Sequence, residues 1–237
     1  MKLPQPLRRG TLVNRYKRFL ADIVLDDGRE ITAHCANPGS MLGVAIEGAR
    51  VWAWEHGDKK RKLAFSWELV EIGKTLVPVN TTNPNRIVAE ALEAGVIPEL
   101  TGYADIRREV KYGEGSRIDL LLEGGRRKKP CYVEIKNVHL SRVPGLAEFP
   151  DSVTARGAKH LKELETVAQN GARAVMMFVV QRSDCRRFSP AADLDPAYAE
   201  ALKSAISAGV ELICYDCEVT TSEVVLRKAL EMDLDRK

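Results

Sequence analysis

The sequence predicts an α/β protein overall, with an all-β barrel in residues 1–80 followed by an α/β domain with a mixed sheet in residues 81–237. Two observations lead to this prediction. Short runs rich in β-branched and aromatic residues, separated by turn residues, fill the first third of the chain. From about residue 85 onward, runs with helical spacing alternate with apolar runs of strand length, which is the pattern of α/β domains.

The first domain is expected to contain five short strands, at residues 19–25, 31–35, 50–54, 64–70 and 75–79. Turn-forming pairs such as Asp27-Gly28 and Glu47-Gly48 separate them. Strands of this length and number in so short a segment favour a small barrel of the OB type.

The second domain is expected to begin with a helix at residues 86–94, which Gly95 ends. Three strands joined by glycine-rich turns follow, at residues 106–112, 117–122 and 131–138. The remaining elements are a helix over about residues 152–170, a strand at 172–181, a helix at 196–208 and a strand at 210–215. Residues 220–232 could form a short helix that helps binding, although the turn of a helix-turn-helix motif is missing.

The cysteines argue against a disulfide framework, because their number is odd and they are dispersed along the chain. Cys214 and Cys217 form a C-x-x-C pair, but on a strand their side chains point to opposite faces, which favours buried core residues over a metal site. The N-terminus lacks the apolar segment of a signal peptide, and the longest apolar stretch is only strand-sized. A cytoplasmic protein, which could associate with the nucleoid, is therefore expected.

The positive charge of the chain is concentrated in its first third. Residues 1–78 contain 13 Lys and Arg against 9 Asp and Glu, whereas the remainder contains 23 against 24. This distribution favours an anionic partner for the N-terminal domain.

Three carboxylates are predicted to form one row across the meander of residues 106–138. Simple hairpins centred on the two glycine-rich turns place Glu109 opposite Asp119, and Asp119 opposite Glu134. Lys136 lies on the same face. The alternating residues of the opposite face should be core, and they are Val110, Ile118, Leu120, Leu122, Cys131, Val133 and Ile135.

This row suggests a metal site, because like charges opposed in a sheet need compensation. Mg²⁺ or Mn²⁺ would suit the oxygen ligands of Asp119, Glu134 and the backbone carbonyl of Ile135. Lys136 could then orient a water molecule or stabilise charge on a phosphoryl group. The pattern is equally typical of an ordinary charged sheet face, neutralised by salt bridges to Arg107, Lys111 and Arg117.

Basic residues of the first domain are candidates for phosphate contacts. They are Arg15, Lys17 and Arg18, together with the run Lys59, Lys60, Arg61 and Lys62. Aromatic residues lie between them in the sequence, and these are either core residues or platforms on which bases stack. The alternative for the basic run is a solvated loop.

Two resemblances sharpen these hypotheses. The segments Arg117-Ile118-Asp119 and Glu134-Ile135-Lys136 resemble the PD-(D/E)xK nuclease signature, although Ile118 replaces the nominal proline. A closer resemblance, to the sugar fermentation stimulation protein A family, covers nearly the whole chain. Its stretches include His34-Cys35-Ala36-Asn37-Pro38-Gly39-Ser40-Met41, Val133-Glu134-Ile135-Lys136-Asn137-Val138 and Phe149-Pro150-Asp151-Ser152-Val153-Thr154-Ala155-Arg156-Gly157.

The resemblance implies an OB-like N-terminal domain, a restriction-endonuclease-like C-terminal domain and DNA binding without sequence specificity. It also directs attention to Glu90, where nucleases of the PD-(D/E)xK type often carry a helical acid that reaches the metal. Arg156, Lys159 and His160 open the helix after Glu-Ile-Lys and could hold a phosphate, or form a solvated basic face.

Two functions therefore stand as hypotheses. The first is a Mg²⁺-dependent (or Mn²⁺-dependent) nuclease that acts on nucleic acid, with DNA as the favoured partner. The second is a DNA-binding regulator of sugar (maltose) metabolism that has no catalytic activity.

Overall fold

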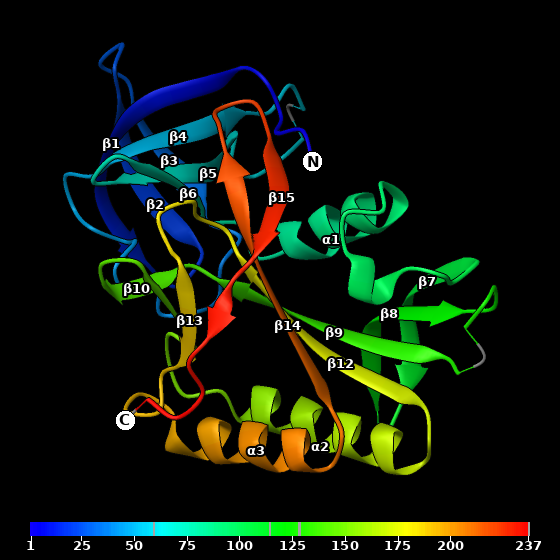
Figure 1. Cartoon of the computed structure of the whole chain (residues 1–237). Coiled ribbons are helices and arrows are strands. Elements are labelled where there is room, and N and C mark those ends of the chain that lie inside the picture. Colours follow the sequence, from blue (N-terminus) through cyan, green and yellow to red (C-terminus); the bar gives the residue numbers. More distant parts are fainter. Residues whose placement is uncertain (59, 114, 128, 237) are drawn as a thin grey trace.

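The N-terminal strands close into a barrel, as predicted (Figure 1). The computed structural model describes residues 1–58, 60–113, 115–127 and 129–236. The barrel strands lie in the order β3-β2-β1-β4-β5-β6, and β3 also pairs in parallel with β5 through Ala33 and Phe65. Their bounds are β1 Leu7–Tyr16, β2 Leu20–Leu25, β3 Glu30–His34, β4 Arg50–Glu55, β5 Phe65–Ile72 and β6 Thr75–Pro78.

The barrel closes around a core of its own. Leu12, Ile23, Met41 and Trp67 are all buried in it, and the Nε1 of Trp67 donates to the carbonyl of Leu69 at 2.9 Å. A buried indole N–H needs such a partner. The sequence allowed the barrel aromatics to be either core residues or platforms for base stacking, and Trp67 is a core residue.

The C-terminal domain is built on a mixed sheet, with strands in the order β15-β14-β12-β9-β8-β7. Strand β12 pairs in parallel with β9 on one side and with β14 on the other, and the remaining pairs of this sheet are antiparallel. The strands are β7 Asp105–Tyr112, β8 Ser116–Glu123, β9 Cys131–Val138, β12 Arg173–Val180, β14 Glu211–Val219 and β15 Val224–Ala229. The helices are α1 Asn83–Glu93, α2 Ala155–Gln169 and α3 Pro196–Ser207, with a 3-10 turn at Pro98–Leu100.

A smaller sheet, not predicted, has the order β10-β11-β13-β16. Its strands are β10 Leu140–Val143, β11 Leu146–Phe149, β13 Arg187–Pro190 and β16 Glu231–Met232. The helix expected at residues 220–232 is wrong, because this segment forms β15 and β16. Val224 and Leu226 are buried and alternate with exposed residues, which is a strand pattern.

The two faces of the large sheet have different cores. Figure 1 shows α2 and α3 side by side against one face, and Leu161, Leu164 and Leu202 supply their buried contacts. The other face packs against α1 through Ile87 and Val88, and this core also includes Leu69 of the barrel. The barrel and the sheet therefore share apolar contacts. These contacts hold the two domains in one relative position.

The first residues of the chain pack in the core that the barrel and the C-terminal domain share. Met1 and Leu3 lie in the core that faces α1, and Lys2 forms a bridge with Glu223. The five cysteines are free and buried, with Cys214 and Cys217 in opposite cores, as their spacing predicts. Among the described residues, no helix has the length and apolar character needed to cross a bilayer.

Candidate active site

A cleft of about 980 Å³ lies between the barrel and the C-terminal sheet. Asn37, Pro38 and Gly39 line it from the barrel side, and β8, β9 and the start of α2 line it from the other. Asp119, Glu134 and Lys136 all lie in its wall. The structure thus brings together the three residues that the sequence pattern placed at the centre of the site.

The predicted register of the meander is confirmed. Arg108 pairs with Leu120 and Val110 with Ile118, so Glu109 lies opposite Asp119, and Leu120 pairs with Val133. The ladder between β8 and β9 ends at that last pair. Beyond it, Asp119 Oδ2 accepts the backbone N–H of Ile135 at 2.7 Å, so a carboxylate takes the place of a strand carbonyl.

The predicted face is wrong for Val110 and Ile118, which both pack against the core under α2 and α3. Ile118 packs in the core under α2 and α3, whereas Leu120 packs in the opposite core, although the two are two positions apart. Glu109, directly across, has a φ of 52°. An irregularity of this kind re-aims side chains in a sheet, and here it directs Asp119 toward α1, where Asn85 Nδ2 donates to its Oδ1 at 2.7 Å.

Glu134 is held from two sides. Lys136 Nζ donates to its Oε1 at 2.8 Å, and His160 Nδ1 contacts the same oxygen. Glu134 is only 3% exposed, and its second oxygen, Oε2, is buried without any hydrogen-bond partner. Buried carboxylate oxygens are nearly always paired, so an unpaired one on a cleft wall points to a ligand that the protein itself does not supply.

His160 lines the cleft but is only 6% exposed there. Its imidazole lies between Glu134 and Arg156, whose Nε is 3.3 Å from the Nε2 of His160. The sequence carried a signal for this, because Gly157, Leu161 and Leu164 share its helix face and are buried. His160 therefore positions Glu134.

The two carboxylates have opposite electrostatic environments. Burial, and then the nearby charge of Glu134, raise the pKa of Asp119 to about 6. Burial also acts to raise the pKa of Glu134, but the contacts with His160 and Lys136 outweigh it and leave this pKa below its ordinary value. The contacts of Glu134 thus stabilise its anionic form, whereas the direct hydrogen-bond donors of Asp119, Asn85 and the N–H of Ile135, are uncharged.

Because of this difference, the isosteric substitutions Asp119→Asn and Glu134→Gln should change the free energy of unfolding of the cation-free protein in opposite directions. Asp119→Asn should raise the free energy of unfolding at pH 7 by roughly 1–3 kcal/mol. Asparagine still accepts from Ile135, and Asn85 can rotate its amide to accept in turn. Glu134→Gln should lower the unfolding free energy, because it removes the anion that His160 and Lys136 face.

Thermal unfolding in EDTA as a function of pH measures both effects. A raised folded-state pKa means that wild type loses stability as pH rises from about 4 to about 6. The advantage of Asp119→Asn should therefore be full above about pH 6 and vanish below about pH 4. A melting temperature that falls for both variants at pH 7 would contradict this description of the site.

The loop from Asn37 to Met41 joins the two domains at the edge of the cleft. Asn37 is 1% exposed, accepts the N–H of Gly39 at 2.9 Å and donates to the carbonyl of Val79 at 3.1 Å. Asp151 of the C-terminal domain accepts the N–H of Met41 at 2.8 Å, and a Cβ on Gly39 would come within 3.0 Å of its Oδ2. The turn thus has a structural role, which its turn chemistry alone did not reveal.

Asp151 anchors this loop and contacts His139 at 3.3 Å. Burial acts to raise the pKa of Asp151, but His139 and the N–H of Met41 lower it to about 2. Asp151→Ala should reduce the unfolding free energy by roughly 2–3 kcal/mol, since hydrogen bonds to a charged group are lost. Glu47→Ala, which removes an exposed carboxylate of the barrel domain, is the matched control and should change little.

Chemical denaturation at several pH values tests this anchor. Because the folded-state pKa is lowered, the contribution of Asp151 is present above about pH 4 and lost as pH falls toward about 2. The difference between wild type and Asp151→Ala should shrink over that range. Equal stabilities at pH 7 would mean that the loop is held in another way.

Two of the predicted acids lie outside the centre of the site. Glu109 is exposed on the rim of the cleft, and its backbone carbonyl accepts from Arg117. Glu90 does not line the cleft at all. Its carboxylate binds the N-terminal amine at 2.8 Å and Arg86 at 2.9 Å, because it lies on a different face of α1 from Asn85.

The predicted basic residues fall into three groups. Arg156 and Lys159 are on the cleft wall at the start of α2, with Lys159 also 3.7 Å from Glu163. Arg15 is committed to the barrel, because its guanidinium donates to backbone carbonyls of Arg18, Asn37 and Gly39. The exposed residues Lys17, Arg18, Lys60, Arg61 and Lys62 lie outside the cleft, and Lys59 lies outside the described residues.

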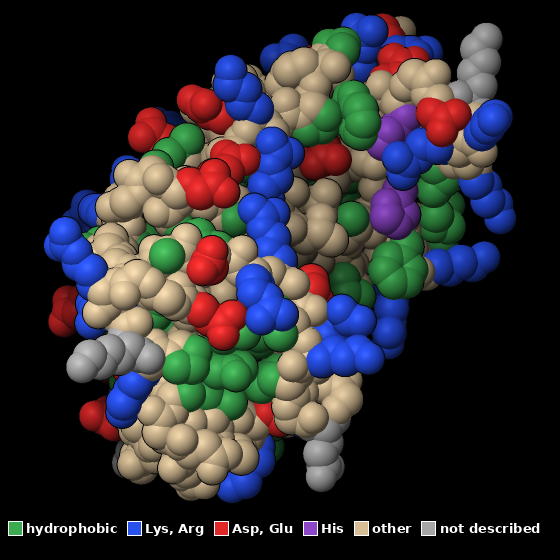
Figure 2. Space-filling model, turned by 90° about the vertical axis from the view of Figure 1, so that its right-hand side faces the viewer, with side chains coloured by type: hydrophobic (Ala, Val, Ile, Leu, Met, Phe, Trp, Pro, Cys, Tyr) green, Lys and Arg blue, Asp and Glu red, His purple; other side chains and the backbone are tan. Residues whose placement is uncertain are grey.

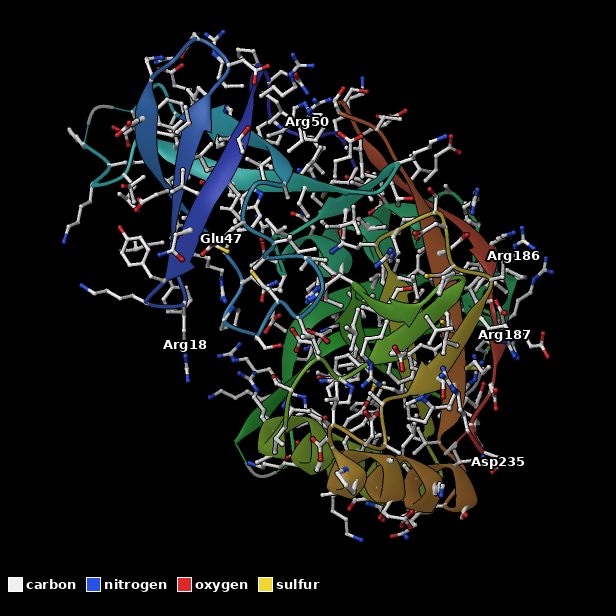
Figure 3. All side chains as sticks on the ribbon, turned by 90° about the vertical axis from the view of Figure 1, so that its left-hand side faces the viewer. Arg18, Glu47, Arg50, Arg186, Arg187 and Asp235 are labelled. Atoms are coloured by element: carbon white, nitrogen blue, oxygen red, sulfur yellow. The ribbon has the colours of Figure 1, made fainter. Side chains whose placement is uncertain are left out.

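The figures show where this charge lies. Arg18 extends from the tip of the β1–β2 hairpin, while Arg186 and Arg187 lie at a distance from it on the C-terminal domain (Figure 3). Figure 2 shows Lys and Arg side chains spread over both domains around a hollowed region, with carboxylates between them. The Lys and Arg residues that line the cleft itself all belong to the C-terminal domain, and they are Arg117, Lys136, Arg156 and Lys159.

The residues present fit a divalent cation of the oxygen-preferring kind. In the part of the chain that the structure describes, no group of three His, Cys, Asp or Glu side chains is close enough to hold a metal ion. The candidate donors are instead the carboxylates of Asp119 and Glu134 and the backbone of Ile135, which together line the cleft. Mg²⁺ is typically bound by one or two carboxylates with water and phosphate completing the shell, and the unpaired Oε2 of Glu134 suits this role.

The fold and the cleft define a class of two-domain protein, in which an OB-like barrel is joined to a mixed α/β domain. A family model described as the SfsA N-terminal OB domain matches residues 13–79, and one described as the sugar fermentation stimulation protein RE domain matches residues 82–223. The chain belongs to the sugar fermentation stimulation protein (SfsA) family.

Relatives align over almost the full length of the chain. The sugar fermentation stimulation protein homolog of Maricaulis maris is 53% identical over 236 residues, covering 100% of both chains. That of Caulobacter vibrioides is 54% identical over 230 residues, covering 97% of this chain and 96% of the relative. The solved structure of Pyrococcus furiosus SfsA in complex with Ca²⁺ has 28% identity and a TM-score of 0.87, covering 98% of each chain.

Proposed function

We propose that this protein is a divalent-cation-dependent phosphodiesterase, a nuclease that acts on DNA held between its two domains. The observation that carries the proposal is the convergence of Asp119, Glu134 and Lys136 in one cleft, where Glu134 has a buried oxygen without a partner. An ordinary charged sheet face would be solvated, but the side chains of Glu134 and Lys136 are only 3% and 13% exposed.

Asp119, Glu134 and the carbonyl of Ile135 would hold the cation. Mg²⁺ or Mn²⁺ bound there supplies Lewis-acid polarisation of a phosphoryl oxygen and lowers the pKa of a bound water. The Pyrococcus furiosus SfsA structure is a complex with Ca²⁺. Because Ca²⁺ also prefers oxygen ligands, this relative supports a divalent cation in the proposal.

The residues around the carboxylates have separate tasks. His160 and Lys136 keep Glu134 ionised, and Asn85 and the N–H of Ile135 orient Asp119. The ammonium of Lys136 lies within the cleft wall, where it can stabilise negative charge that develops on the phosphate. Arg156 and Lys159, near the N-terminal end of α2, favour phosphate binding at the cleft edge.

The test is cleavage of labelled single- and double-stranded DNA by wild-type protein in Mg²⁺, in Mn²⁺ and in EDTA. Cleavage that requires the cation supports the proposal. Intact DNA under every condition, with salt-sensitive binding retained, would reject it.

The second candidate is a DNA-binding regulator of sugar metabolism without catalysis. The name of the relatives, sugar fermentation stimulation protein homolog, favours it, and the basic residues of both domains suit either function. The complete pair of carboxylates with its lysine favours the nuclease, because a site that has lost its reaction has no need to keep Glu134 buried and ionised.

A further inference from the structure

Two pairs of rings lie on the outside of the barrel on either side of Ser66, and we call these four side chains the ring strip: Phe19 with His34, and Trp54 with His56. Strand pairing aligns it, because Leu20 lies opposite His34, and both His34 and Trp54 lie opposite Ser66. Phe19 and His34 stack with ring centroids 6.3 Å apart and planes at 16°. The ring centroids of Trp54 and His56 lie 3.9 Å apart. His56 Nε2 is hydrogen-bonded to Ser66 Oγ at 2.7 Å, and Ser66 is also the strand partner of His34.

Phe19 is the exposed member of the ring strip, and His34, Trp54 and His56 are half-buried. Phe19 is 44% exposed, whereas Trp67 is 0% and Phe65 is 7% exposed. Figure 2 shows His side chains at the surface close to Lys and Arg side chains, whereas His139 and His160 are buried. Packing of the barrel core therefore does not account for these rings.

One end of the ring strip meets the cleft. The carbonyl of Phe19 accepts the N–H of Cys35 at 2.8 Å, two residues before Asn37 in the cleft wall. Arg15 links the residue before Phe19 to the cleft wall, because its guanidinium donates to the carbonyls of both Arg18 and Asn37. A chain lying on the rings could thus continue into the cleft over this short stretch of surface.

Positive charge borders the ring strip at both ends. Lys17 and Arg18 immediately precede Phe19 and are exposed. At the other end, Arg61 contacts the Nδ1 of His56 at 3.1 Å, and Lys60 and Lys62 flank it in the same loop. Among the described residues of this loop, 56–58 and 60–64, there are three Lys or Arg against one carboxylate, Asp58, so the border complements a phosphate backbone.

We propose that the ring strip binds single-stranded nucleic acid, with bases stacked on its rings and phosphates against its basic border, and leads that strand into the cleft. Bases offer a π-face to such rings only when they are unpaired, so a duplex cannot use them. The inference deepens the proposed nuclease, because it assigns a single strand as the substrate. Its binding step is nevertheless independent of catalysis.

The experiment measures binding of a labelled oligothymidine of about 20 nucleotides, alone or annealed to its complement, in EDTA, so that no cation-dependent cleavage contributes. Phe19→Leu keeps an apolar side chain but removes the ring, and Phe19→Tyr keeps the ring. Val225→Ala, at a 44% exposed apolar residue of the C-terminal domain, is the control for loss of an apolar surface. Because these residues are exposed, the fold should tolerate the changes.

Wild type should bind the single strand more tightly than the duplex. Phe19→Leu should weaken single-strand binding by about fivefold to a hundredfold, while Phe19→Tyr and Val225→Ala bind as wild type does. Single-strand binding unchanged in Phe19→Leu, or equal affinity for the duplex, would overturn the inference. Ring-dependent binding without any cleavage in Mg²⁺ would reject the nuclease alone, and cleavage without ring dependence would reject the ring strip alone.

Discussion

Replacing both Asp119 and Glu134 with alanine is expected to reduce DNA cleavage by on the order of 10³-fold or more, because the Lewis acid contributes several kcal/mol to the barrier. Asp119 and Glu134 are the proposed side-chain ligands, whereas the other two carboxylates of the cleft lie on its rim (Glu109) or bind the loop at Met41 (Asp151). The backbone of Ile135 alone would not retain the cation. DNA binding in EDTA should be kept or slightly strengthened, since two negative charges leave the cleft.

Cleavage rates and binding affinities are measured on the same preparations of wild type and Asp119→Ala/Glu134→Ala. The matched control is Glu47→Ala/Glu93→Ala, which also removes two carboxylates, both exposed and both absent from the cleft wall. The control should cleave as wild type does. A double variant Asp119→Ala/Glu134→Ala that cleaves at the wild-type rate would place the activity elsewhere.

Lys136→Met is expected to lower the cleavage rate by about 10²- to 10³-fold, the loss typical when one group that stabilises transition-state charge is removed. The ammonium of Lys136 is 2.8 Å from Glu134 Oε1 in a largely buried position. Methionine keeps the length of the side chain without its charge. Cation affinity should not fall, because the site becomes more negative.

This variant separates two roles for Lys136. If it stabilises the reacting phosphate, additional Mg²⁺ will not restore the rate of Lys136→Met, and Lys136→Arg will restore part of it. If Lys136 only neutralises Glu134, Lys136→Met will cleave normally and bind Mg²⁺ more tightly. Cleavage rates measured over a range of Mg²⁺ concentrations distinguish the two.

The parts of the fold that the sequence predicted well depend on local signals. Glycine-rich turns fixed the register of the meander, and the observed pairs Val110 with Ile118 and Leu120 with Val133 confirm it. Strand β1 was not predicted, because its arginines and Gly10 obscure the alternation that marks a half-buried strand. The short strands β10, β11 and β13 were missed for lack of length, since runs of four residues carry little periodicity.

The candidate site, too, could be predicted only where it depends on local sequence pattern. Asp119, Glu134 and Lys136 are carried by neighbouring strands, so strand periodicity could place them on one face. The contacts that tune them come from distant segments: Asn85 reaches Asp119 from α1, and His160 reaches Glu134 from α2. Pattern alone cannot predict such contacts, because they depend on how the helices pack across the sheet.

The link between the barrel loop and the C-terminal domain is also non-local. Asp151 and Met41 are 110 positions apart in the chain, and only the packing of the two domains brings them together. The break in alternation at Asp119 is a related case, because it depends on the backbone of Glu109 in the facing strand. Regular geometry predicted that Ile118 and Leu120 share a face, and the irregularity separates them.

The proposed nuclease is tested most directly by measuring Mn²⁺ occupancy and DNA cleavage on one sample as Mn²⁺ is added. Electron paramagnetic resonance follows the free cation, and a labelled single strand reports cleavage. We predict that one Mn²⁺ binds in wild type, that Asp119→Ala/Glu134→Ala does not bind it, and that cleavage rises in step with occupancy. A site that fills with Mn²⁺ while the strand stays intact would contradict the nuclease and favour a DNA-binding protein without catalysis.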